Sequence, residues 1–162
     1  MSNLTQVQAE EQCRILRLKR NAKVQEADRS YREEISRLFR EFQEAVEKMD
    51  EEIIHLKSQI AQVRYDMNVA WDNHYNLHKD DEKEPVMGII VNPFKLKISE
   101  LQLQMETIIN SKNHLRELYK HNRALAAHNR ECINRDAEDE YINARTLVME
   151  QVVSRNEQLS DK

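Results

Sequence analysis

Glycine and proline are almost missing from this sequence, and their scarcity limits where the chain can turn. One glycine and two prolines occur in 162 residues, as Pro85, Gly88 and Pro93. A compact globule of this length needs several turns, and turns depend on glycine, proline, asparagine and aspartate. Because all three residues lie in one short window, we expect a single turn with uninterrupted helix on either side of it.

Other scarce features exclude further classes of protein. The two cysteines, Cys13 and Cys132, provide no disulfide framework. A net charge of −4 gives no basis for a nucleic-acid or membrane partner, and the longest apolar run, residues 86–91, is far shorter than the roughly 20 residues that span a bilayer. The first residues carry neither a basic leader nor an apolar core. We therefore expect no signal peptide, and a location in the cytoplasm or within an assembly built there.

What the sequence does contain is typical of long helices. One third of the residues are charged and only 6% are aromatic. Thr5 followed by Gln8 fits a capping box, and Asn92-Pro93 offers an N-cap residue and a first-turn proline for a second helix. The sequence predicts one all-α domain over residues 1–162, with a first arm at 5–79, an elbow at 80–92 and a second arm at 93–160.

Apolar residues recur at alternating steps of three and four, which is the spacing of a coiled-coil seam. The pattern is weaker before Tyr31 in the first arm, where Leu4, Val7, Ile15, Leu18 and Ala22 continue it, and past Ile133 in the second arm, where Ala137, Tyr141, Ala144 and Val148 continue it. The expected seam of the first arm consists of Tyr31, Ile35, Leu38, Phe42, Ala45, Met49, Ile53, Leu56, Ile60, Val63, Met67, Ala70, His74 and Leu77. That of the second arm consists of Phe94, Ile98, Leu101, Met105, Ile108, Lys112, Leu115, Tyr119, Asn122, Ala126, Asn129 and Ile133.

Such a narrow stripe has to meet another helix, and the elbow supplies one in the same chain. We predict an antiparallel two-helix coiled-coil hairpin in which residue numbers that sum to about 173 face each other. In that register an acidic block, 41–52, lies opposite a basic stretch, 121–132, and the acidic cluster 136–140 lies opposite Arg32, Arg37 and Arg40. An elbowed parallel oligomer is the alternative, but it would place each charged block beside its own copy.

Several polar features are candidate sites. His74 and His78 are one turn apart, as a metal pair would be, but no third ligand is fixed beside them. The polar seam residues Lys112, Asn122 and Asn129 either fix the register or loosen the second arm. The stripe formed by His114, His121 and His128 is either a pH sensor or a solvated face.

The basic segment 13–23 either contacts an anionic surface or forms the charged face of a helix. It contains no aromatic residue to stack on bases, which argues against nucleic acid. The sequence contains no nucleophile–base pair, glycine-rich phosphate loop or Cys-x-x-Cys motif. We therefore expect no enzyme, no cofactor and no metal.

The elbow is the strongest candidate for a contact site, because a turn at the tip of a hairpin is normally polar and this one is apolar. Two readings stay open: the segment docks a partner, or it folds back as a small local core. β-branched residues there also suggest a short extended piece. The predicted partner-binding residues are Trp71, Tyr75, Val86, Met87, Ile89, Ile90, Val91 and Phe94.

Two antiparallel helices with such an elbow have an outline that looks like that of the flagellar and type III export stalk proteins. An elbow with a short extended piece also resembles that of prefoldin subunits. The expected function is a non-enzymatic structural or adaptor protein that braces or spaces components of a larger assembly, such as a virion or a secretion machine. We expect protein partners, in a homo-oligomer or a larger complex. The alternative, implied by the resemblance, is a chaperone or escort that binds clients through the elbow.

Overall fold

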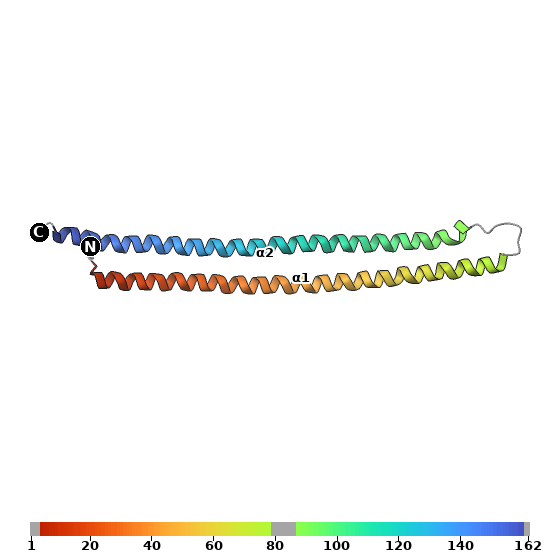
Figure 1. Ribbon diagram of the computed structural model, residues 1–162, viewed down its shortest axis with the longest axis horizontal. Helices are drawn as coiled ribbons and strands as arrows, with labels where there is room; N and C mark the ends of the chain where they lie inside the picture. Colours follow the sequence, from red (N-terminus) through yellow and green to blue (C-terminus); the bar gives the residue numbers. More distant parts are fainter. Residues whose placement is uncertain (1–3, 79–86, 161–162) are drawn as a thin grey trace. The chain divides into compact units, whose positions relative to one another are not determined.

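The computed structural model describes residues 4–78 and 87–160, and these residues form two helices. Helix α1 spans Gln6–His78 and helix α2 spans Met87–Ser160 (Figure 1). The described residues contain no strand. Segments of α1 pack antiparallel against segments of α2, so the predicted all-α helical hairpin is confirmed.

Helix α1 begins at the predicted capping box. The backbone N–H of Gln8 donates to Thr5 Oγ1 at 3.2 Å, and the N–H of Thr5 donates to Gln8 Oε1 at 3.0 Å. These reciprocal bonds satisfy N–H groups that a helix end otherwise leaves without a partner. The helix then continues from the bond between the Ala9 N–H and the Thr5 carbonyl.

Helix α2 begins six residues earlier than the sequence predicted. Asn92 is not its N-cap, because Met87 is already helical and Pro93 lies inside the helix. Residues 89–91, expected to be extended, are helical as well. The physical reason is burial: Val91 is only 3% exposed, so a helical turn at this point places an apolar side chain in the core. Packing of this kind overrides the local preference of β-branched residues and proline.

The chain divides into two units, and each has its own core. Unit 1 consists of Met1–Leu38 with Lys120–Lys162, and unit 2 of Phe39–Tyr119. The core of unit 2 is aliphatic: Leu56 and Ile60 of α1 pack with Ile98 and Leu101 of α2, and Val63, Met105 and Ile108 pack against them. Here the predicted seam is confirmed from Phe42 to His74, whereas Leu77 is exposed.

The core of unit 1 uses smaller side chains than the sequence suggested. Its cluster is formed by Leu4, Ala9, Val148 and Val152, with Cys13 and Leu16 packed against it. Ala27 and Ala137 are also buried. The expected stripe was wrong in four places in α1, and the seam of α2 was wrong in two. The exposed residues are Val7, Ile15, Leu18, Ala22, Asn129 and Ile133.

The predicted register was wrong by about three helical turns. In unit 2 the ring of Phe42 stacks on Tyr119 with centroids 4.5 Å apart, and Lys112 Nζ lies 2.6 Å from Asp50 Oδ1. In unit 1 the guanidinium of Arg130 lies 4.1 Å from the ring centre of Tyr31. The facing residue numbers in both units therefore sum to about 161, and not to about 173.

Candidate docking surface at the start of helix α2

The residues of the predicted elbow site lie partly in the core and partly on the surface. Val91 is buried, and Ile90 and Phe94 are half-buried, so these three contribute to the packing of unit 2. Ile89 is 74% exposed, and Tyr75 on α1 is also exposed. The local-core interpretation therefore applies to the buried side of the segment, and the docking prediction is kept only for the exposed side that carries Ile89.

Three further predicted residues add less to this surface. Trp71 is half-buried, and its ring stacks on the ring of His74 within α1, with centroids 6.3 Å apart. Val86 and the side chain of Met87 lie outside the described residues. The surface is consequently built from residues that follow Gly88 in α2.

An exposed aliphatic ridge follows Ile89 along α2. Leu96 is 63% exposed and Leu103 is 64% exposed. Ile89, Leu96 and Leu103 are seven residues apart, and seven residues fall only about 20° short of two full turns, so the three side chains line one face of the helix. We call this set the α2 ridge.

The α2 ridge lies on the far side of the helix from the core. Ile98 and Leu101 are buried against α1, whereas Leu96 and Leu103 face solvent. Sequence reasoning missed Leu96 and Leu103 because it assigned one apolar stripe to each helix. The repeated seven-residue spacing, outside the seam, was the signal that could have revealed them.

A shallow depression lies beside the first part of the ridge. It is open to solvent, has a volume of about 820 Å³ and is lined by Gly88, Ile89, Asn92, Pro93, Lys95, Leu96 and Ser99. Gly88 has no side chain and Ser99 a short one, whereas Ile89 and Leu96 are large. A depression of this form can receive an aliphatic side chain from another surface.

Charged residues are sparse around the α2 ridge. Residues 87–110 contain four of them, Lys95, Lys97, Glu100 and Glu106, which is 4 of 24, whereas 33% of the whole chain is charged. Among the residues that the structure describes, none of these four has an ion-pair partner. Depletion of charge around exposed apolar side chains is typical of the centre of a protein interface.

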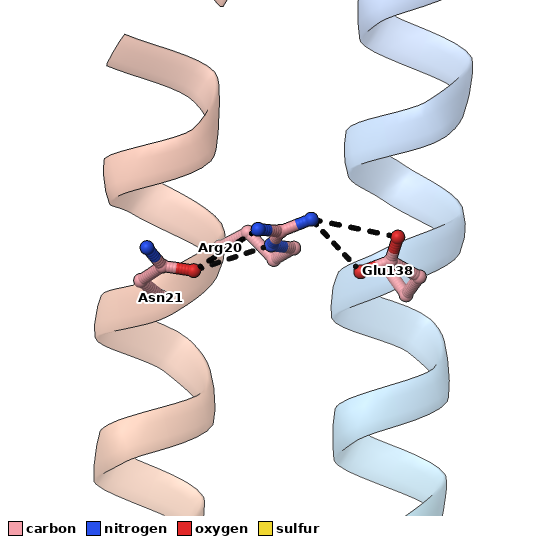
Figure 2. A network of polar contacts seen from close by, with 3 residues as sticks. All are labelled: Arg20, Asn21 and Glu138. Atoms are coloured by element: carbon pink, nitrogen blue, oxygen red, sulfur yellow. Dashed lines mark hydrogen bonds and ion pairs between the residues drawn. The ribbon is translucent and has the colours of Figure 1, made fainter. Parts of the chain in front are cut away.

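The basic segment 13–23 is the main competing site, and its charges are partly engaged within unit 1. Arg20 Nη1 lies 3.2 Å from Glu138 Oε2, and the same guanidinium donates to Asn21 Oδ1 (Figure 2). Lys23 forms an ion pair with Glu140, and its hydrogen bond to that carboxylate holds the pKa of Glu140 below its usual value. The acidic cluster thus pairs with this segment, and not with Arg32, Arg37 and Arg40 as predicted.

The histidine side chains that the structure describes show no arrangement for metal binding. His114, His121 and His128 are exposed, as the solvated-face reading predicted. His128 Nε2 lies 3.4 Å from Cys132 Sγ, one turn further along α2. Within residues 4–78 and 87–160, no group of three or more His, Cys, Asp or Glu side chains could hold a metal ion. The side chain of His78 is outside the described residues.

The polar residues of the predicted seam differ in burial. Lys112 is half-buried and pairs with Asp50 across unit 2, which fits the register role. Asn122 is half-buried and Asn129 is exposed. Asn134, which the sequence did not single out, has a buried Oδ1 atom without a hydrogen-bond partner in the described part of the chain.

Neither helix, over the described residues, has an apolar stretch long enough to cross a membrane. Comparisons of the chain with models of known protein families, with curated proteins and with solved structures found no match.

Proposed function

We propose that this chain is a non-enzymatic structural or adaptor protein that braces or spaces components of a larger assembly and contacts them through the α2 ridge. The observation that carries the proposal is the exposure of Ile89, Leu96 and Leu103 on one face with little charge around them. Burying apolar surface stabilises a complex by about 25 cal/mol per Å². Exposed apolar patches of this kind therefore commonly mark contact sites.

The hairpin suits such a role because one face of α2 packs in the core and the opposite face is exposed. The inner face of α2 holds Ile98 and Leu101 in the core of unit 2. The ridge on its outer face is not needed for that core, so it can be covered by a partner without a change in the hairpin.

We place the assembly in the cytoplasm. Both cysteines are free thiols, Cys13 half-buried in the core of unit 1 and Cys132 half-buried on α2. Free thiols persist in a reducing compartment, whereas disulfides form and persist in an oxidising one.

An escort for other proteins is the second candidate, and unit 1 supplies the observation that favours it. Several aliphatic side chains there are exposed in both helices, among them Val7, Ile15, Leu18, Ile142 and Leu147. Scattered apolar side chains of this kind suit brief contacts with many clients. A structural component instead has a fixed stoichiometry with its neighbours.

The test is to isolate the tagged intact chain from cells that make it and to quantify the proteins that accompany it. The proposal expects a small set of proteins at fixed ratios to the chain, lost when Leu96→Ser and Leu103→Ser are combined. The matched control is Ile54→Ser with Tyr65→Ser, since these α1 side chains are 67% and 64% exposed. A large set of clients at variable ratios, unaffected by the ridge variant, would favour the escort.

A further inference from the structure

We infer that the α2 ridge pairs with the same ridge of a second copy of this chain, with the two α2 helices antiparallel. This inference rests on the proposed function, because it names a partner for the proposed contact surface. Three features of residues 87–110 support this pairing: the spacing of the ridge side chains, the positions of the four charged residues and the area of the exposed helix face.

The spacing gives a surface that fits its own copy. The ridge is one side chain wide, with Ile89, Leu96 and Leu103 repeating every seven residues. The residues three and four positions away from them are their neighbours on the helix surface: Asn92, Pro93, Ser99 and Thr107 are uncharged, and Glu100 and Glu106 are acidic. A narrow aliphatic ridge flanked by such residues packs against a helix with the same period, because each large side chain then fits between those of the partner.

The charges favour the antiparallel order. At 100° per residue, Lys95 and Glu106 lie on one flank of the ridge, and Lys97 and Glu100 lie on the other. In an antiparallel pair each flank meets the same flank of the partner. A two-fold axis midway between Leu96 and Leu103 sets these two leucines against each other.

In that register both lysines of each copy gain an acidic neighbour. Lys95 comes within two residues of Glu106 of the second copy, and Lys97 within two residues of Glu100 of the second copy. These four side chains have no ion-pair partner among the described residues of their own chain. Pairing across copies therefore breaks no ion pair that the described residues make within one chain.

The area of the face predicts a weak dimer. Residues 87–110 extend over about 36 Å, and a helix is about 10–12 Å across, so each copy offers about 400 Å². Two such faces bury about 800 Å² in total, which is below the 1,200–2,000 Å² of a stable complex. We therefore expect association in the micromolar range, sensitive to the loss of a single ridge side chain.

Sedimentation equilibrium of the purified intact chain, from about 5 to 500 µM, tests this inference. The wild-type chain should shift from monomer to dimer as its concentration rises. Combining Leu96→Ser and Leu103→Ser should weaken association at least about tenfold, whereas Ile54→Ser with Tyr65→Ser should leave it unchanged. Circular dichroism should show equal helix content in all three proteins, because the substituted side chains are exposed.

Charge reversal tests the antiparallel order separately. Lys95→Glu should weaken the dimer, and so should Glu106→Lys, because each places like charges side by side. The two changes in one chain should restore wild-type association. A wild-type monomer at every concentration, a dimer indifferent to the ridge variant, or no restoration by the double reversal would each overturn the inference.

The two proposals can fail separately. If the purified chain is a monomer but still loses its accompanying proteins on mutation of the ridge, self-pairing is wrong and the docking function stands. If the chain neither associates with itself nor loses accompanying proteins on mutation of the ridge, both proposals are wrong.

Discussion

Gly88 and Pro93 both disfavour a helix, and both lie in the first two turns of α2. Glycine in a helix costs about 1 kcal/mol relative to alanine, and proline leaves a carbonyl one turn earlier without its helical N–H donor. The start of α2 is thus held by the burial of Val91 and the partial burial of its neighbours more than by local preference. This weak helix end carries the first residue of the α2 ridge, Ile89.

Gly88→Ala should raise the free energy of unfolding by about 0.5–1 kcal/mol, because alanine restricts the unfolded chain and favours helix. Gly88 has no positive φ, and an added Cβ would make ordinary contact with Asn92 Nδ2 at 3.4 Å. Urea denaturation followed by circular dichroism measures the difference. A loss of stability would show that this turn is not helical in solution.

Sequence signals for a helix start were reliable only where both partners of the interaction lie close in the sequence. The capping box was predicted because Thr5 and Gln8 satisfy each other within one turn. Asn92-Pro93 carried an equally clear start signal, but Val91 just before it is buried within a helical turn. Sequence preference alone gives no account of such packing.

Helices α1 and α2 show which properties of an element the sequence determines. Their existence followed from the confinement of glycine and proline to one window, and the seam of unit 2 followed from the step of three and four. The register did not follow, because it was inferred from the two residues taken to flank the turn, and a start of α2 that is six residues too late accounts for about half of the error in the sum. Exposed ion pairs are worth only tenths of a kcal/mol each, so charge blocks could not correct the error.

Two spin labels can measure the register of unit 1. Cys132 lies opposite about residue 29, which is about 16 residues, or about 24 Å along the helix, from Cys13. The register with a sum of about 173 would place the same labels about 42 Å apart. Double electron–electron resonance on the doubly labelled chain should therefore give the shorter distance between the two labels. Diluting it with unlabelled chain excludes distances between copies, and a maximum near the longer value would refute the observed packing.

The whole molecule combines two units of different character. Unit 2 has an aliphatic core of Leu56, Ile60, Ile98 and Leu101. Unit 1 depends more on small residues and on ion pairs between its helices, such as Arg20 with Glu138. The candidate site belongs to unit 2. The sequence located it near the elbow and named Ile89, but Leu96 and Leu103 were missed because only one apolar stripe was assigned to α2.

Hydrogen–deuterium exchange tests most directly whether the α2 ridge is the contact surface. In the dilute, free chain the backbone amides of residues 88–96 should exchange rapidly, since Gly88 and Pro93 weaken this helix end, and those of residues 97–104, beside the core residues Ile98 and Leu101, more slowly. In the assembly isolated from cells the same amides should exchange markedly more slowly, with unit 1 changing little. Equal exchange over residues 88–104 in the two states, or protection confined to unit 1, would contradict the account.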